Sequence, residues 1–212
     1  MRSSKPLHNP APLLVFGAGG HGRVVAEAAM LEKHWHSIHA STRSLPAGQS
    51  ELLPGINLLD VDAALALDPA VHIAIGNNQA REKEAQAWGH ERLASVVHPA
   101  ANVSQFSIIA TGCFVAASAV VGPMAIVGMG VIVNHGAVID HDVEVGAFSH
   151  IAPNASLGGH AKVGQRVLIG SGAVVLPSIT IGDDVIVGAG SVVNANLREP
   201  GTYAGIPARK IV

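Results

Sequence analysis

The sequence predicts an α/β N-terminal half-Rossmann domain followed by a parallel β-helix of hexapeptide repeats, and two observations carry this prediction. The first is a run of sixteen consecutive hexapeptides without insertion, from Val103 to Arg198, whose first place is always Val, Ile or Leu. The second is a glycine-rich turn at residues 17–22 that separates an apolar run from a helical pattern.

A period of six fits neither an α-helix nor an ordinary strand, and it is typical of a parallel β-helix built from short strands and turns. With three hexapeptides per triangular coil, the repeats make five coils and one further hexapeptide, about 25 Å tall at the spacing of stacked strands. We expect the first and fifth places to point inward. The second to fourth places lie outside near the corners, where Gly, which takes the second place in half of the repeats, is expected to supply unusual backbone angles.

The chain divides into three parts: a disordered lead-in at 1–12, a Rossmann-like domain at 13–95, and a β-helix with a closing C-terminal segment at 96–212. The apolar, turn and helical patterns of the middle part predict its elements in order. These are a strand at 13–16, a helix at 23–35, a short helix at 61–67, a third parallel strand at 71–75 and a helix at 81–88.

The glycine-rich turn before a helix N-terminus forms a site for an anion such as a phosphate. A nicotinamide dinucleotide site also needs an acid about 20 residues further on. Residues 39–42 read His-Ala-Ser-Thr and contain no acid. This argues against a redox dinucleotide and leaves a nucleotide phosphate as the ligand. The strand at 71–75 ends at Gly76, where open α/β sheets bind ligands.

Composition excludes several other classes of function. The net charge is −2 with 13% charged residues, so no basic surface for nucleic acid is expected. The single cysteine, Cys113, falls on an inward fifth place and is predicted to be a buried filler. The N-terminus lacks an apolar signal segment, so we expect a cytoplasmic protein. Residues 108–133 carry no charge, but the hexapeptide period continues through them, which favours a wall covered by a neighbouring subunit over a membrane span.

The histidines of the repeats are the candidates for chemistry. His135 and His141 occupy third places at successive corners, and residues 18 apart stack, so Gly159 should lie on His141 and His160 on Asp142. A carboxylate beside an imidazole raises its basicity, as a general base needs, although a solvated turn has the same composition. We expect the corners to keep these groups too far apart for a metal. No Ser-His-Asp or Cys-His arrangement for a nucleophile stands out, which favours direct transfer of a group to an acceptor over a covalent intermediate on the enzyme.

These features together resemble the sugar acyltransferases that join a Rossmann-like domain to a left-handed parallel β-helix. The family includes the N-acetyltransferases of bacillosamine and perosamine synthesis and the sialic-acid O-acetyltransferases. The resemblance covers residues 13–212. It is carried by the motifs GAGGHG (17–22), AIGNN (74–78), VNHGAVIDHD (133–142), FSHIAP (148–153) and YAGIPARKI (203–211). It implies the left-handed coil, acetyl-CoA as cosubstrate, no metal, and a homotrimer with sites in its three clefts.

The resemblance also implies roles for individual residues. His141 would be the general base and Asp142 its supporting carboxylate. Substrate-binding positions would be Gly19, Gly20 and His21 for the diphosphate, with Ser41, Thr42 and Gly76 near the nucleoside or sugar. Acetyl-CoA-binding positions would be His150, Gly159, Ser171, Ala189 and Arg209.

Two departures from the family pattern leave alternatives open. Family members that bind UDP-sugars commonly carry an acidic pair where this chain has Ser41 and Thr42, and His135 replaces a small residue. The sequence predicts N-acetylation of a nucleotide-linked amino sugar, with a UDP-4-amino-4,6-dideoxy-hexose of the bacillosamine type as the substrate. The alternatives are a GDP- or dTDP-amino sugar, O-acetylation of sialic acid or a related sugar, and a non-catalytic nucleotide-sugar-binding scaffold.

Overall fold

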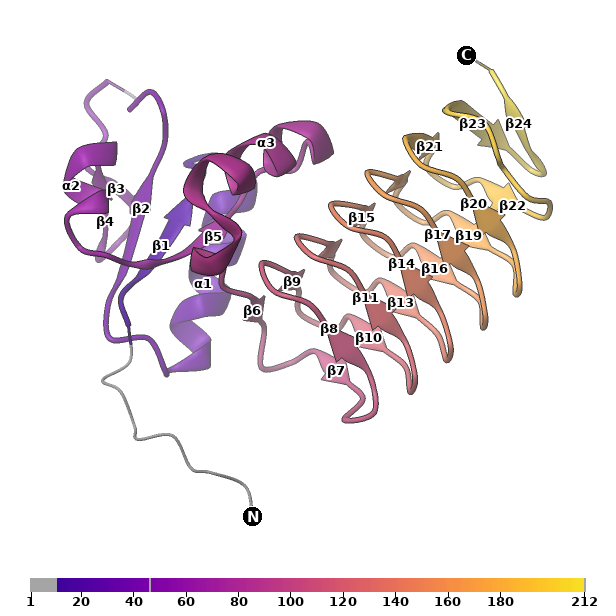
Figure 1. Cartoon of the computed structure of the whole chain (residues 1–212), viewed down its shortest axis with the longest axis horizontal. Coiled ribbons are helices and arrows are strands. Elements are labelled where there is room, and N and C mark those ends of the chain that lie inside the picture. The colour runs from indigo at the N-terminus through magenta and orange to yellow at the C-terminus, as the bar shows by residue number, and fades with distance from the viewer. Residues whose placement is uncertain (1–10, 46, 212) are drawn as a thin grey trace.

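The computed structural model describes residues 11–45 and 47–211, which form an α/β unit followed by a triangular prism of stacked coils (Figure 1). The lead-in expected to be disordered, residues 1–12, lies outside the described ranges except for its last two residues. Of these, Pro12 accepts a hydrogen bond through its carbonyl from the Ala70 N–H at 3.0 Å.

The α/β unit is a five-stranded sheet in the order β3-β4-β2-β1-β5, with all neighbours parallel except β3 and β4. Strand β1, which lies between β2 and β5, is fully buried, and its four residues are all apolar, as a strand covered on both faces requires. The elements are β1 (Leu13–Phe16), α1 (Gly20–Glu32), β2 (Ile38–Ser41), β3 (Glu51–Leu53), β4 (Ile56–Leu59), α2 (Val61–Leu65), β5 (Ala70–Ile73), α3 (Asn78–Trp88) and the 3₁₀ helix η1 (His90–Arg92).

This unit differs from the prediction in one hairpin and in the bounds of its helices: α1 ends at Glu32 and α3 begins at Asn78, each three residues before the predicted position. The hairpin of β3 and β4 was not predicted because each strand is short, although Pro54-Gly55 between them, with Gly55 at φ 83°, is a typical turn pair. Helix α1 starts at Gly20, three residues earlier than the apolar pattern indicates. The first turn of the helix therefore includes the end of the glycine-rich motif.

The prism has three walls of parallel two- and three-residue strands, closed by a C-terminal hairpin. The first wall contains β6 (Val96–Val97), β9 (Phe114–Val115), β12 (Ile132–Val133), β15 (His150–Ile151), β18 (Leu168–Ile169), β21 (Val185–Val187), β23 (Gly201–Gly205) and β24 (Ala208–Lys210). The second wall contains β7 (Asn102–Val103), β10 (Val120–Val121), β13 (Val138–Ile139), β16 (Ser156–Leu157), β19 (Val174–Val175) and β22 (Val192–Val193). The third wall contains β8 (Ile108–Ile109), β11 (Ile126–Val127), β14 (Glu144–Val145), β17 (Lys162–Val163) and β20 (Thr180–Ile181).

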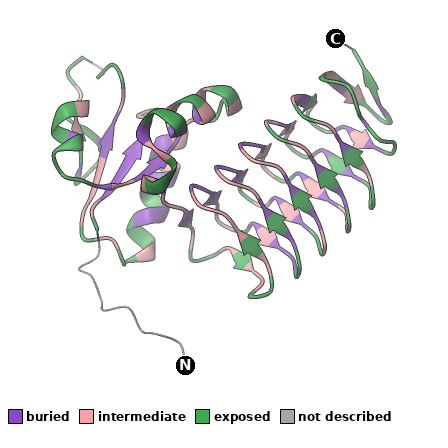
Figure 2. Ribbon diagram, viewed as in Figure 1, coloured by how far each residue is buried: buried purple, intermediate pink, exposed green. Residues whose placement is uncertain are grey.

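The inward direction of the first and fifth places is confirmed. Their side chains form one core that runs along the prism, and only the end coils leave some of them partly exposed. Figure 2 colours the ribbon of the prism by this burial. Cys113 belongs to this core at 0% exposure, and burial raises its pKa to about 12. Its thiol is therefore protonated at neutral pH and acts as packing, not as a nucleophile.

The expectation about glycine at the corners was wrong in one respect. The left-handed backbone falls on the fourth place of the repeats from Gly112 to Gly190, and many of these residues are not glycine, such as Asp142 (φ 58°) and His160 (φ 61°). Glycine at the second place is required by space instead. A Cβ at Gly146 would lie 2.5 Å from the backbone of Gly164 in the next coil.

The α/β unit packs on the first wall of the prism. Val96, Phe114 and Ile132, which point outward from that wall, are buried in a cluster with residues of α1. This explains part of the uncharged stretch at 108–133 without a second subunit, whereas Ile108 and Ile126 of the third wall remain exposed. Among the described residues, no helix is both long enough and apolar enough to cross a membrane.

Candidate active site

The candidate catalytic pair lies at the corner between the second and third walls, in the turn that links β13 to β14. His141 Nδ1 and Asp142 Oδ2 are 2.8 Å apart, and the backbone N–H of His141 donates to Asp140 Oδ1 at 2.7 Å. Asp142 has a left-handed backbone conformation (φ 58°), and its carboxylate contacts the preceding side chain. Both side chains of the pair are partly exposed, so a substrate can reach them.

The hydrogen bond to Asp142 sets the tautomer and the base strength of His141. With Nδ1–H donating to the carboxylate, Nε2 keeps its lone pair for an incoming proton. The pKa of His141 is raised, chiefly by this hydrogen bond and further by the charges of Asp140 and Asp142. The pair therefore has the geometry and the charge of a supported general base.

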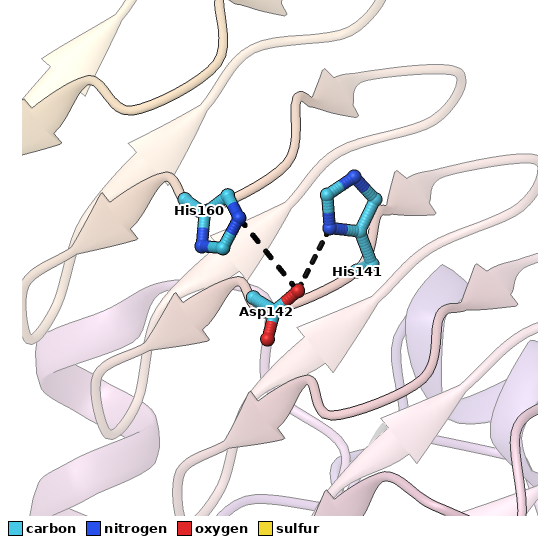
Figure 3. A group of neighbouring side chains, drawn as sticks. All are labelled: His141, Asp142 and His160. Atoms are coloured by element: carbon cyan, nitrogen blue, oxygen red, sulfur yellow. Dashed lines mark hydrogen bonds and ion pairs between the residues drawn. The ribbon is translucent and has the colours of Figure 1, made fainter.

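The predicted stacking of the next coil is confirmed. A Cβ added at Gly159 would lie 2.5 Å from His141 Cε1, so only glycine leaves room for the ring. His160 lies over Asp142, with its Nε2 3.8 Å from Asp142 Oδ2 and its ring edge-on to His141 (Figure 3). The expectation that the corners separate these groups was wrong, since ligand atoms of the three side chains lie within 4.8 Å of one another.

A second group of predicted residues gathers at the carboxyl edge of the α/β sheet. The strands β1, β2 and β5 are parallel, so their ends bring the first turn of α1, Ser41 and Gly76 to one edge. A Cβ added at Gly19, Gly20 or Gly76 would meet no described atom within 4 Å, which leaves open space before the helix. Ser41 is fully buried and its Oγ has no partner among the described residues, while Thr42 is half-buried.

The side chain of His21 does not face this open space as a cation. Its ring packs edge-on against Phe114 of the prism, 5.3 Å between centroids, and its Nε2 lacks a partner among the described residues. Burial, followed by the charges of neighbours such as His72 and His150, lowers its pKa to about 3. A neutral ring cannot form an ion pair with a diphosphate, so His21 can contribute only hydrogen bonds to that role, from its backbone N–H or its single ring N–H.

His150 lies between the two units, on the outer face of β15. It lines a groove of about 370 Å³ together with Gly76, Asn77, Asn78, Gln79, Leu168 and Ile186. Burial and the charge of Arg81 lower its pKa to about 4, so it is neutral. Asn134 Nδ2 lies 3.1 Å from His150 Nε2 and donates to it in that state. Sequence reasoning missed Asn134, although its position directly before His135 in the VNHGAVIDHD motif was a signal.

The remaining predicted residues lie on different corners. Ser171 and Ala189 are exposed and stack at 18-residue intervals on the corner of His135, between the first and second walls. Gly159 belongs to the corner of His141, one wall away. Arg209 is exposed in β24 at the end of the prism, with its Nη1 donating to the Ala208 carbonyl. One chain therefore distributes the predicted acetyl-CoA residues over two corners, the first wall and the C-terminal end of the prism.

Arg81 is a further residue that the sequence did not reveal. Its side chain is 1% exposed and fixes the start of α3 to the prism by donating to neutral oxygens only. The acceptors are the carbonyls of Ile75, Gly76, Gly130, Phe148 and Ser149 and the Asn78 side-chain oxygen. Because two acceptors flank the Gly76 turn and two precede His150, Arg81 determines how the sheet edge sits against the prism.

Comparison with known proteins places this geometry in context. Residues 12–87 match the family described as PglD N-terminal domain, and residues 160–195 match Bacterial transferase hexapeptide (six repeats). No curated protein matches the sequence.

Several solved structures are similar over nearly the whole chain. The acetyltransferase domain of PglB from Neisseria gonorrhoeae is 34% identical, with a TM-score of 0.86, covering 94% of this chain and 99% of that chain. Its complex with acetyl coenzyme A is 33% identical, with a TM-score of 0.86 and coverage of 95% and 100%. A histidine-to-asparagine mutant of perosamine N-acetyltransferase from Caulobacter crescentus, bound to CoA and GDP-perosamine, is 30% identical. Its TM-score is 0.86, and the match covers 95% of this chain and 97% of that chain.

Proposed function

We propose that this chain N-acetylates a nucleotide-linked amino sugar. The chain belongs to the family of acetyl-CoA-dependent acetyltransferases that have a PglD-type N-terminal domain and a left-handed hexapeptide-repeat β-helix. The observation that carries the proposal is the pairing of His141 with Asp142 at 2.8 Å beneath the glycine gap at Gly159. The solved relatives support the cosubstrate and the acceptor class, since one binds acetyl coenzyme A and another binds CoA with GDP-perosamine.

In the proposed reaction His141 is the general base. The sugar amine attacks the thioester carbonyl carbon, and His141 Nε2 accepts the proton that the nitrogen loses as the new C–N bond forms. Asp142 stabilises the resulting imidazolium through Nδ1–H. When the C–S bond breaks, the imidazolium can return the proton to the departing thiolate. The products are the N-acetyl sugar and CoA, and His141 is neutral again.

The edge of the α/β sheet is the proposed site for the nucleotide. Gly19, Gly20 and His21 lie at the N-terminus of α1, with open space at the two glycines, and there a diphosphate would be stabilised by the backbone N–H groups of the first turn and by the helix dipole. The buried, unpartnered Oγ of Ser41 and the adjacent Thr42 are the proposed nucleoside contacts. Gly76 is the proposed contact for the sugar or nucleoside.

We assign the substrate as a UDP-4-amino-4,6-dideoxy-hexose of the bacillosamine type and the compartment as the cytoplasm, where acetyl-CoA is available. Neutral hydroxyls at Ser41 and Thr42 replace the acidic pair common in UDP-sugar enzymes. GDP- and dTDP-linked amino sugars are therefore the comparison substrates.

We further propose that the active unit is a homotrimer with a site in each cleft. In one chain the base lies on the corner between the second and third walls, whereas His150 lies on the first wall and Ser171 on the far corner of the second. Side-by-side packing of prisms brings such corners together. The third wall carries exposed apolar residues that such packing would cover: Phe106, Ile108, Met124 and Ile126.

The proposal is tested by thiol release from acetyl-CoA with 4-amino-4,6-dideoxy sugars linked to UDP, GDP or dTDP, together with product mass and NMR. We expect turnover with an acetyl group on the amine nitrogen, fastest with the UDP sugar. Faster turnover of a GDP- or dTDP-linked sugar would show that the nucleoside is not uridine and would assign the faster nucleotide instead. Acetylation of a hydroxyl, or no turnover of any of these sugars, would contradict the proposed function.

A further inference from the structure

The cluster of His141, Asp142 and His160 contains one imidazole more than the proposed transfer uses. The reaction assigns roles to His141 and Asp142 only. Yet the coil stacking holds His160 on the same carboxylate oxygen, with Asp142 Oδ2 2.8 Å from His141 Nδ1 and 3.8 Å from His160 Nε2 (Figure 3). Two imidazoles and one carboxylate thus converge on a single point.

The spacing suits a small divalent cation. Zn²⁺ binds imidazole nitrogen and carboxylate oxygen at about 2.0–2.2 Å, so two ligand atoms of a tetrahedral site lie about 3.3 Å apart. The two distances to Asp142 Oδ2, 2.8 and 3.8 Å, lie on either side of this value, and all three ligand atoms fall within 4.8 Å. All three side chains are exposed, so small rotations complete the site and a cation enters from solvent.

The surrounding charges favour a cation. The ionic partners of Asp142 are the two imidazoles, and Asp140 places a second carboxylate beside His141. Glu144 lines the same depression as Asp142 and His160, where Lys162 neutralises it at 2.8 Å. The carboxylates of Asp140 and Asp142 therefore supply the negative potential at the cluster.

We propose that His141, Asp142 and His160 form a binding site for a divalent first-row transition metal such as Zn²⁺, and that the bound metal switches off the general base. This metal is an inhibitor and not a cofactor of the transfer. The inhibitory part of the proposal rests on the proposed function, whereas metal binding itself does not.

The expected inhibition follows from the tautomer of His141. A metal on Nδ1 displaces the hydrogen bond to Asp142, and the ring proton moves to Nε2. The nitrogen that faces the amine then carries a hydrogen and has no lone pair to accept another. No net proton is released from His141, and the ring remains neutral but cannot act as a base.

Metal binding is tested on the untagged, full-length protein after treatment with a chelator. Zn²⁺ is titrated by calorimetry, and Co²⁺ by the visible absorption of a tetrahedral site. The test variant is His160→Asn, because Asn tolerates the left-handed backbone at this position. His90→Ala removes an exposed histidine elsewhere as a matched control. We expect one Zn²⁺ per chain, bound at least about tenfold more weakly after His160→Asn and unchanged in the control.

Inhibition is then measured with saturating Zn²⁺ in the thiol-release assay. We expect at least a tenfold loss of turnover that a chelator reverses, and a His160→Asn variant with normal basal turnover that the same Zn²⁺ concentration does not inhibit. Absence of Zn²⁺ binding, or equal binding by His160→Asn, would overturn the site. Binding at the site with undiminished turnover would overturn the switch. If the metal-free protein acetylates no sugar, the proposed function fails while the calorimetry still decides the site.

Discussion

Three histidines that are buried or half-buried, His21, His72 and His150, predict that the protein loses stability steeply in mild acid. Burial, which removes water from the rings, lowers the pKa of His21 to about 3 and the pKa values of His72 and His150 to about 4, against 6.5 in an unfolded chain. Between these values the unfolded state binds a proton at each ring and the folded state does not. Protonation therefore favours unfolding as pH falls below about 6.5, and the stability is regained above it.

The size of this effect follows from the linkage relation. Each such ring costs about 1.4 kcal/mol per pH unit between the two pKa values, so three rings cost about 4 kcal/mol per unit below about pH 6. Because folded domains are stable by only about 5–15 kcal/mol, we expect unfolding near about pH 4–5.

The contribution of His72 can be isolated. This ring is 1% exposed, and its Nδ1–H donates to the Ala94 carbonyl at 2.9 Å. His72→Asn keeps a donor at that point and removes the titration. Urea unfolding at several pH values between about 7 and 5 should show that the variant loses stability about one third less steeply than the native protein. Equal slopes for the two proteins, or a native stability that does not change over this range, would refute the reasoning.

Four further substitutions separate the fold from the site. Gly22→Ala places a Cβ 1.9 Å from the Gly17 carbonyl oxygen, so the free energy of unfolding measured in urea should fall by more than about 2 kcal/mol. The Cβ of Gly20→Ala meets no described atom, so this substitution should raise only the KM for the nucleotide sugar. Gly159→Ala displaces the ring of His141 at the surface, so kcat should fall by about tenfold to a hundredfold with little change in Tm. Arg81→Met leaves six oxygens without their donor and should cost about 3 kcal/mol or more in urea unfolding. A folded, fully active Gly159→Ala enzyme or a Gly22→Ala variant of native stability would contradict the corresponding contact.

The parts of the fold that obey a strict period could be predicted from the sequence. The first and fifth places predict the direction of the core side chains, and the 18-residue coil predicts that Gly159 lies on His141 and His160 on Asp142. The order of the main helices and strands followed from apolar runs. The hairpin at 51–59 escaped because its strands are too short to show alternation.

The contacts between the two units could not be predicted because no local pattern encodes them. The sequence marks His21 as part of a phosphate motif, but the packing of the prism wall, through Phe114, turns its ring away from that role. Arg81 resembles an ordinary helix-surface arginine until its carbonyl partners, far along the chain, are brought to it. Spacing alone stacks His160 on Asp142 but does not give the rotamers, which is why the approach of both imidazoles to one oxygen of Asp142 was not predicted.

The measurement that tests the central claim most directly is the turnover of acetyl-CoA and the amino-sugar nucleotide by His141→Ala beside the native protein. The general base is expected to contribute about a hundredfold to ten-thousandfold, so kcat should fall by at least about a hundredfold while the fold, followed by circular dichroism, is retained. Asp142→Asn should give a smaller loss, because the imidazole remains but its supporting charge is removed. Undiminished turnover by His141→Ala would contradict the account and direct attention to His135 on the neighbouring corner.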